Sequence, residues 1–66
     1  MQIIVNKEAK VVQSTLLADI LSELGLGDKP GIAVALNAAV ISRTRWNETL
    51  LQDGDSLTII RATQGG

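Results

Sequence analysis

Hydrophobic residues alternate with polar ones at the start of the chain in the manner of a β-strand. The stretch 1–6 is rich in β-branched residues, and alternation directs one set of side chains to one face: Met1, Ile3 and Val5. Residues 6–9 are polar, and Asn6 favours a turn because asparagine tolerates left-handed backbone angles. Residues 10–13 then return as a second strand, so the sequence predicts an N-terminal hairpin.

The next segment carries a helical period. Aliphatic side chains recur at i, i+3, i+4 and i+7 and form one stripe: Leu17, Ile20, Leu21 and Leu24. Ser14 or Thr15 is expected to cap the first turn, since either hydroxyl accepts an unpaired N–H. Gly25 is placed just beyond the helix, with Leu26 folding back on the last turn in a Schellman motif.

The second half of the chain predicts shorter elements. After a loop at 27–31, residues 32–37 form a strand whose large side chains alternate with alanine. A turn at 38–39 leads to a brief apolar segment, and the region 42–51 is expected to hold a helical turn around Trp46 plus an edge strand. Residues 52–55 form a turn by their Asp and Gly content, and 57–62 form the last strand, with Leu57 and Ile59 inward.

This order of elements indicates an α+β fold: a mixed sheet with one main helix packed on one face, which is the β-grasp or ubiquitin-like architecture. We expect residues 1–62 to form this domain and 63–66 to form a flexible tail. Alternation leaves Ile4 and Ile60 on the face that the helix does not cover. Aliphatic side chains on an open sheet face are a plausible docking site for a partner.

Composition and charge exclude several functions. With 45% hydrophobic and 20% charged residues the chain is an ordinary globular domain, and its net charge of -1 gives no electrostatic basis for binding nucleic acid or an anionic membrane. No apolar run approaches the roughly 20 residues that span a bilayer, and no export signal is recognisable, so we expect a cytoplasmic protein. The sequence has no cysteine and no histidine, which argues against a metal site and an activated nucleophile.

Two polar clusters have structural interpretations that we favour over functional ones. Asp53 and Asp55 flank a glycine as in a turn, and no third ligand type accompanies them as a metal site would require. Arg43 and Arg45 beside Trp46 form a candidate phosphate or partner contact. We favour a solvated loop in which the indole covers the edge of the core.

The C-terminal tail is the remaining candidate site. It reads Thr63-Gln64-Gly65-Gly66, and its two glycines leave a bare backbone that can enter a channel too narrow for side chains. Fully extended, these four residues span about 13 Å. A frayed end without function is the alternative.

The whole chain resembles the thiamine-biosynthesis sulfur carrier (ThiS) family of ubiquitin-like proteins. The residues that carry the resemblance are the start Met1-Gln2-Ile3, the segments 36–37 and 40–43 with Trp46, the turn 52–55 and the final Gly65-Gly66.

The resemblance implies a carrier protein and co-substrate, with no bound cofactor, and assigns the sulfur to the α-carboxylate of Gly66. An adenylating, ThiF-like partner enzyme uses ATP and Mg to activate this carboxylate. A persulfide sulfur donor then converts it to a thiocarboxylate, which delivers sulfur to a ThiG-like thiazole synthase. Gly65, Gln64 and Thr63 thread the backbone into the partner, and Ile4 and Ile60 are the docking candidates.

The sequence is also compatible with other functions of the same fold. A carrier for another pathway, similar to the small subunit of molybdopterin synthase, shares the tail and its activation. Those subunits tend to be longer and richer in aromatic residues, whereas this chain has neither Phe nor Tyr. A ubiquitin-like protein modifier and a plain interaction module with an incidental tail are further alternatives. An enzyme acting alone is disfavoured, because no acid–base pair can be assembled.

Overall fold

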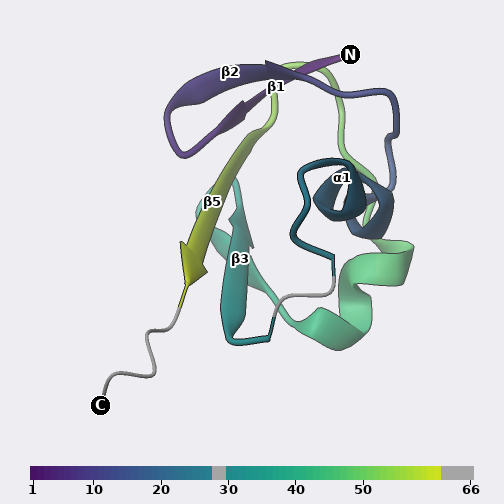
Figure 1. The fold of residues 1–66 in the computed structure, drawn as a ribbon. Helices are drawn as coiled ribbons and strands as arrows, with labels where there is room; N and C mark the ends of the chain where they lie inside the picture. Colours follow the sequence, from purple (N-terminus) through teal and green to yellow (C-terminus); the bar gives the residue numbers. More distant parts are fainter. Residues whose placement is uncertain (28–29, 62–66) are drawn as a thin grey trace.

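The computed structural model describes residues 1–27 and 30–61. Its elements are, in chain order, β1 Gln2–Val5, β2 Glu8–Val11, α1 Leu17–Glu23, β3 Ile32–Leu36, β4 Ala39–Ile41, the 3₁₀ helix η1 Arg43–Glu48 and β5 Ser56–Arg61. The strands form one sheet in the spatial order β2-β1-β5-β3-β4, in which β1 and β5 are parallel and the other neighbours antiparallel. Both α1 and η1 lie on one side of this sheet (Figure 1). The predicted α+β, β-grasp architecture is confirmed.

Both hairpins close with a two-residue turn. Asn6 and Lys7 join β1 to β2, and their φ angles are 49° and 72°. Asn37 and Ala38 join β3 to β4 with φ of 49° and 73°. Two successive positive φ angles are the signature of a type I′ turn, whose twist matches the twist of the strands that it connects.

These tight turns correct two predicted boundaries. The strand β2 begins at Glu8, two residues before the predicted Lys10, because the turn takes only two residues. The second turn lies at 37–38 instead of 38–39, so Ala39 belongs to β4. The sequence signal was weak because lysine and alanine occupy the positions at which this turn usually has glycine.

The helix α1 buries the predicted stripe and ends as predicted. Leu17, Ile20 and Leu21 are fully buried, and Leu24 packs against them from a half-buried position. Gly25 has a φ of 78°, and its N–H donates to the Ser22 carbonyl at 3.0 Å. The N–H of the next residue donates to the carbonyl of the third-last helical residue at 2.8 Å, which completes a Schellman motif.

The predicted N-cap of α1 is wrong. Neither Ser14 nor Thr15 caps the helix; Leu16 occupies the N-cap position, and it makes no side-chain hydrogen bond. Instead, the Leu17 N–H donates to the carbonyl of Thr49 at 2.8 Å. A distant segment of backbone therefore satisfies one of the first-turn donors that a hydroxyl would otherwise satisfy.

The hydrophobic core lies between the sheet and α1. Its buried members are Ile3, Val5, Val12, Leu17, Ile20, Leu21, Ile32, Val34, Trp46, Leu51 and Leu57. Trp46 closes one edge with 5% exposure, and its Nε1 donates to the Ile41 carbonyl at 3.1 Å. Of the predicted inward pair on β5, Leu57 is fully buried and Ile59 is half-buried.

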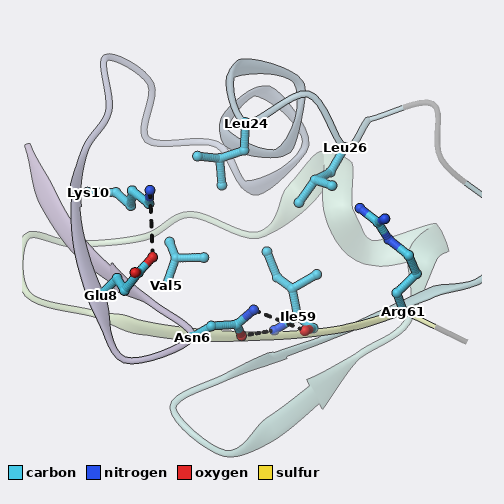
Figure 2. Close-up of a pocket in the computed structure, with 8 residues that line it drawn as sticks. All are labelled: Val5, Asn6, Glu8, Lys10, Leu24, Leu26, Ile59 and Arg61. Carbon is cyan, nitrogen blue, oxygen red and sulfur yellow. Dashed lines mark hydrogen bonds and ion pairs between the residues drawn. The ribbon is translucent and has the colours of Figure 1, made fainter.

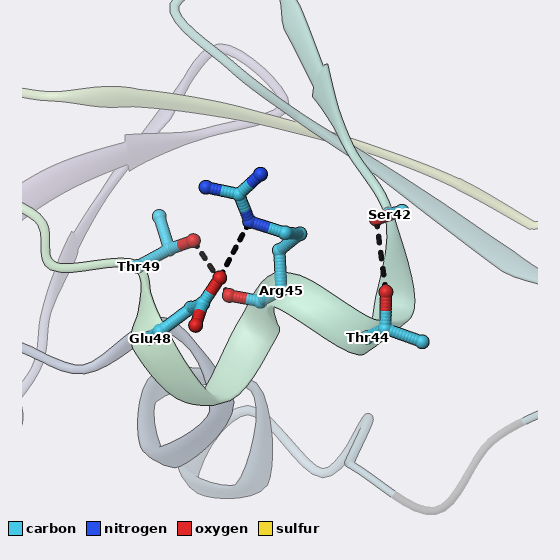
Figure 3. A network of polar contacts seen from close by, with 5 residues as sticks. All are labelled: Ser42, Thr44, Arg45, Glu48 and Thr49. Atoms are coloured by element: carbon cyan, nitrogen blue, oxygen red, sulfur yellow. Dashed lines mark hydrogen bonds and ion pairs between the residues drawn. The ribbon is translucent and has the colours of Figure 1, made fainter.

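The helical turn expected around Trp46 is present as η1. Local bonds hold it: Arg45 Nε lies 2.6 Å from Glu48 Oε1, and the Thr49 hydroxyl donates to the Arg45 carbonyl at 2.7 Å (Figure 3). The edge strand expected beside it is reduced to a single antiparallel bridge between Leu16 and Leu50. None of the helices in the described part of the chain has the length and apolar character needed to cross a membrane.

Candidate functional site

One face of the sheet carries no helix, and the strand register defines its residues. Ile3, Val5, Val34 and Leu57 point toward α1, so alternation sends the residues between them the other way. The strand pairing extends this set across all five strands: Gln2, Ile4, Ala9, Val11, Ala33, Ala35, Val40, Ser56, Thr58 and Ile60. We call this set the open face. None of its members is charged.

Both residues predicted for docking lie on the open face. Ile60 is 59% exposed and Ile4 is half-buried. They are on adjacent strands, but Ile4 pairs with Ser56, four residues before Ile60 along β5. About 13 Å of strand therefore separates them. They mark two parts of the open face and do not form one contact patch of their own.

Sequence reasoning missed two larger contributors to the open face. Val11 is 75% exposed and Val40 is 79% exposed, and both belong to edge strands. Recognition of the two-residue turns would have found them, because such a turn fixes which residues of the two strands share a face. Val11 lies opposite Gln2, and Val40 lies opposite Ala35.

The predicted carrier tail follows β5 in the sequence. Thr63, Gln64, Gly65 and Gly66 lie outside the described residues. The last described residue is Arg61, which ends β5, and β5 is the middle strand of the sheet. Ile60, on the open face, is therefore the residue before the last one that the structure describes.

The two aspartates of the 52–55 turn have structural partners. Asp53 Oδ1 accepts the Gln2 N–H at 2.8 Å, and Asp55 Oδ2 accepts the Gln52 N–H at 2.8 Å. Asp55 Oδ1 also accepts from Asn37 Nδ2 at 3.2 Å. The turn interpretation is confirmed. In the ranges 1–27 and 30–61, acidic side chains do not gather into a group that could hold a metal ion.

The Arg–Trp cluster also has a structural role. The Arg43 guanidinium lies over the Trp46 ring at 4.6 Å from its centroid, a cation–π geometry. Arg45 is paired with Glu48. The indole is buried, so the predicted role of Trp46 as a cover for the core edge is confirmed.

A mixed five-stranded sheet with one main helix on one face defines the chain as a β-grasp, ubiquitin-like protein. The comparison with known families is more specific. The model of the ThiS family matches residues 2–66, nearly the whole chain, and the chain belongs to that family. The resemblance to thiamine-biosynthesis sulfur carriers that the sequence showed is thereby confirmed.

Individual relatives agree with this assignment over the full length of this chain. The chain is 28% identical to the sulfur carrier protein ThiS of Escherichia coli K12, and the alignment covers all of both chains. The crystal structure of the thiamine biosynthesis protein ThiS from Geobacter metallireducens matches with a TM-score of 0.84 at 28% identity, again over all of both chains. A solution structure of a Geobacter metallireducens thiamine biosynthesis protein matches at 0.78 and 26% identity, over 100% of this chain and 88% of the other.

Proposed function

We propose that this chain carries sulfur on its last residue, as a thiocarboxylate formed from the α-carboxyl group of Gly66. The observation that carries the proposal is the family match, which extends through Gly65 and Gly66. The composition supports it, because the sequence contains no cysteine on which sulfur could be held as a persulfide. Asp53 and Asp55 were the candidates for an acid–base pair, and both carboxylates instead accept backbone N–H groups at the 52–55 turn.

The proposed chemistry requires activation, since an α-carboxyl group is ionised at neutral pH and is a poor electrophile. In the first step a carboxylate oxygen of Gly66 attacks the α-phosphorus of ATP and pyrophosphate leaves. In the second, the terminal sulfur of a persulfide donor attacks the acyl carbon, and a C–S bond forms as the bond to AMP breaks. A second thiol of the donor or partner then attacks the remaining S–S bond, which releases the thiocarboxylate and leaves the two thiols oxidised as a disulfide. The ATP and Mg belong to the partner enzyme, and this chain supplies the carbonyl carbon.

We assign docking to the open face. Ordering a flexible tail costs roughly 1–2 kcal/mol per residue, so contacts elsewhere must offset that cost. Interface cores are depleted in charge, and the open face has none while it exposes Ile60, Val11 and Val40. The proposed partners are an adenylating enzyme and the thiazole synthase, each of which must hold the domain while the tail reaches its own active site.

An exchange assay tests the activation step. With the adenylating enzyme of the same organism, the chain is expected to support ATP–pyrophosphate exchange, and deletion of Gly66 is expected to abolish it. Lys7→Gln, in the exposed turn between β1 and β2, serves as the control and retains exchange. Normal exchange by the deletion variant would place the reacting carboxyl group elsewhere.

Intact-mass spectrometry tests the carried species. Protein purified from its own cells under sulfur-replete conditions is expected to show the mass gain that replacement of one oxygen by sulfur produces. Slow-migrating conjugates that form in lysate with ATP, without that mass gain, would favour a protein modifier over a sulfur carrier.

A further inference from the structure

The sheet face that packs α1 is only partly covered by it. The helix α1 has 7 residues, and so is about 10 Å long, whereas β5 has 6 residues and extends for about 20 Å. The chain turns away at Gly25 and leaves the ends of β1 and β5 without a helix above them. A groove of about 500 Å³ lies there, between the end of α1 and the strands (Figure 2).

The inside of the groove is aliphatic. Val5 and Ile59 come from the strands, and Leu24 and Leu26 come from the segment that follows α1, so side chains line it from both sides (Figure 2). Leu24, Leu26 and Ile59 are only half-buried although each packs against the core. The domain thus leaves apolar surface exposed at this place, and an aliphatic side chain of a ligand would cover it.

The rim of the groove is polar, and three of its four groups already have partners. Lys10 Nζ lies 3.8 Å from Glu8 Oε1. The Asn6 side chain bonds the backbone of Ile59 twice, accepting its N–H at 2.8 Å and donating to its carbonyl at 3.3 Å. Arg61 lies at the opposite end from Lys10 (Figure 2) and makes no ion pair within residues 1–27 and 30–61.

We propose that this groove binds a segment of a partner polypeptide in which an aliphatic side chain is followed directly by an aspartate or glutamate. The aliphatic side chain enters between Leu24, Leu26 and Ile59, and the carboxylate pairs with Arg61. A guanidinium presents two parallel N–H donors that match a carboxylate. The charge of the rim favours an acidic occupant. Glu8 and Lys10 neutralise each other, whereas Arg61 has no ion pair with the described residues and leaves one positive charge.

The form of the groove favours a peptide over a small molecule. Small-molecule sites usually enclose most of the ligand and direct several polar groups at it. Here Arg61, which makes no ion pair with the residues that the structure describes, stands at one end of an aliphatic trough. The groove lies on the helix side of the sheet, and the open face lies on the other, so the two surfaces can be occupied together. The inference is independent of the chemistry proposed for Gly66.

A titration followed by NMR tests the proposal on the full-length, ¹⁵N-labelled protein. The probe is a blocked tetrapeptide, glycine-leucine-aspartate-glycine, and the comparison is the same peptide with asparagine in place of aspartate. We expect saturable amide shifts at Leu24, Leu26, Ile59 and Arg61. The asparagine peptide is expected to bind up to about fivefold more weakly, as loss of an exposed charge pair implies.

Matched protein variants complete a double-mutant cycle. Arg61→Gln is expected to bind both peptides equally, whereas Lys7→Gln, the same loss of charge outside the groove, keeps the difference between them. The proposal is overturned if the difference survives in Arg61→Gln, if the shifts map to the open face, or if no saturation occurs by about 10 mM peptide. If the peptide causes no shifts and the groove signals move with protein concentration, the groove binds a second copy of the chain. If the peptide causes no shifts and the groove signals move when Gly65 and Gly66 are deleted, the groove binds the chain's own terminus. Either result would overturn the proposal.

Discussion

At the scale of single residues, Glu23 closes the loop that leads into α1. It is the last residue of the helix, and its two carboxylate oxygens accept the N–H groups of Gln13 and Ser14, each at 2.8 Å. Ser14 is one of the two residues whose hydroxyl was predicted to cap α1. The hydrogen bonds, first the one from the Gln13 backbone and then that with Ser14, hold the pKa of Glu23 below its ordinary value although the side chain is exposed.

This lowered pKa predicts an acid-dependent contribution to stability. A carboxyl group whose pKa is lower in the folded state stabilises the fold above its unfolded pKa, and that contribution is lost as pH falls through the folded pKa. Glu23→Gln is therefore expected to lower the free energy of unfolding at neutral pH. The two proteins should converge as the solution is acidified below the ordinary glutamate range. Urea unfolding at a series of pH values measures this, and a difference that stays constant with pH would contradict it.

At the scale of elements, two asparagines connect both hairpin turns to β5. Asn6 Oδ1 accepts the Ile59 N–H at 2.8 Å, and Asn37 Oδ1 accepts the Ser56 N–H at 3.0 Å. Each asparagine opens a type I′ turn, and each turn lies beside the central strand. The same residue type thus provides the positive φ that the turn needs and a side chain that ties the hairpin to the sheet. The backbone strain falls on the second residue of each turn.

Ala38 is expected to be a strained position. Its φ of 73° costs a residue with a Cβ roughly 1–2 kcal/mol, and glycine removes that cost. Glycine also loses more backbone entropy on folding, so we expect Ala38→Gly to stabilise the protein by about 0.5–1 kcal/mol. Thermal unfolding would show this as a rise of about 2–8 °C for a domain of this size.

The neighbouring alanine provides the control for that substitution. Ala39 lies in β4 and is not among the residues with positive φ. Ala39→Gly is expected to lower stability by about 0.5–1 kcal/mol. Equal effects of the two substitutions would show that backbone strain does not govern the turn.

At the scale of the whole molecule, the domain separates its surfaces by charge. The open face is uncharged, whereas Glu8, Lys10 and Arg61 lie on the helix side around the groove. Alternation along β2 and β5 produces this separation, because neighbouring residues of one strand serve opposite faces. β5 contributes to both surfaces, through Ile60 on the open face and Arg61 at the groove.

A charge placed on the open face tests its role as a docking surface. Ile60→Glu and Val40→Glu are each expected to weaken binding to the adenylating enzyme at least tenfold, because a carboxylate would be desolvated without a partner. Both side chains are mostly exposed, so the fold should be kept. Calorimetric titration measures the affinity.

Leu50→Glu is the matched control for the open face. Leu50 is an aliphatic side chain with 67% exposure, but it lies outside the open face, at the bridge to Leu16. Its substitution should leave the affinity unchanged. Equal losses from Leu50→Glu and Ile60→Glu would remove the open face from the docking hypothesis.

Local patterns account for the predictions that were correct. The stripe from Leu17 to Leu24 and the Gly25–Leu26 ending of α1 depend on residues within two turns of each other. Alternation in 1–6 likewise gave the correct inward face. The N-cap prediction failed because a local rule competed with distant backbone. The Leu17 N–H, which a hydroxyl of Ser14 or Thr15 was expected to satisfy, donates instead to the carbonyl of Thr49.

The sequence alone determined the order of elements, the β-grasp fold and the resemblance through Gly66 to ThiS-type carriers, because periodicity and end chemistry are properties of neighbouring residues. Only the tertiary structure decided how Val11 and Val40 join Ile4 and Ile60 on one face, and that Leu24, Leu26, Ile59 and Arg61 meet in a groove. Those placements depend on strand register and on where a short helix stops over the sheet. Pairing between distant strands and packing of the helix on the sheet set both, and the local turns that fix the hairpin registers carry only a weak sequence signal.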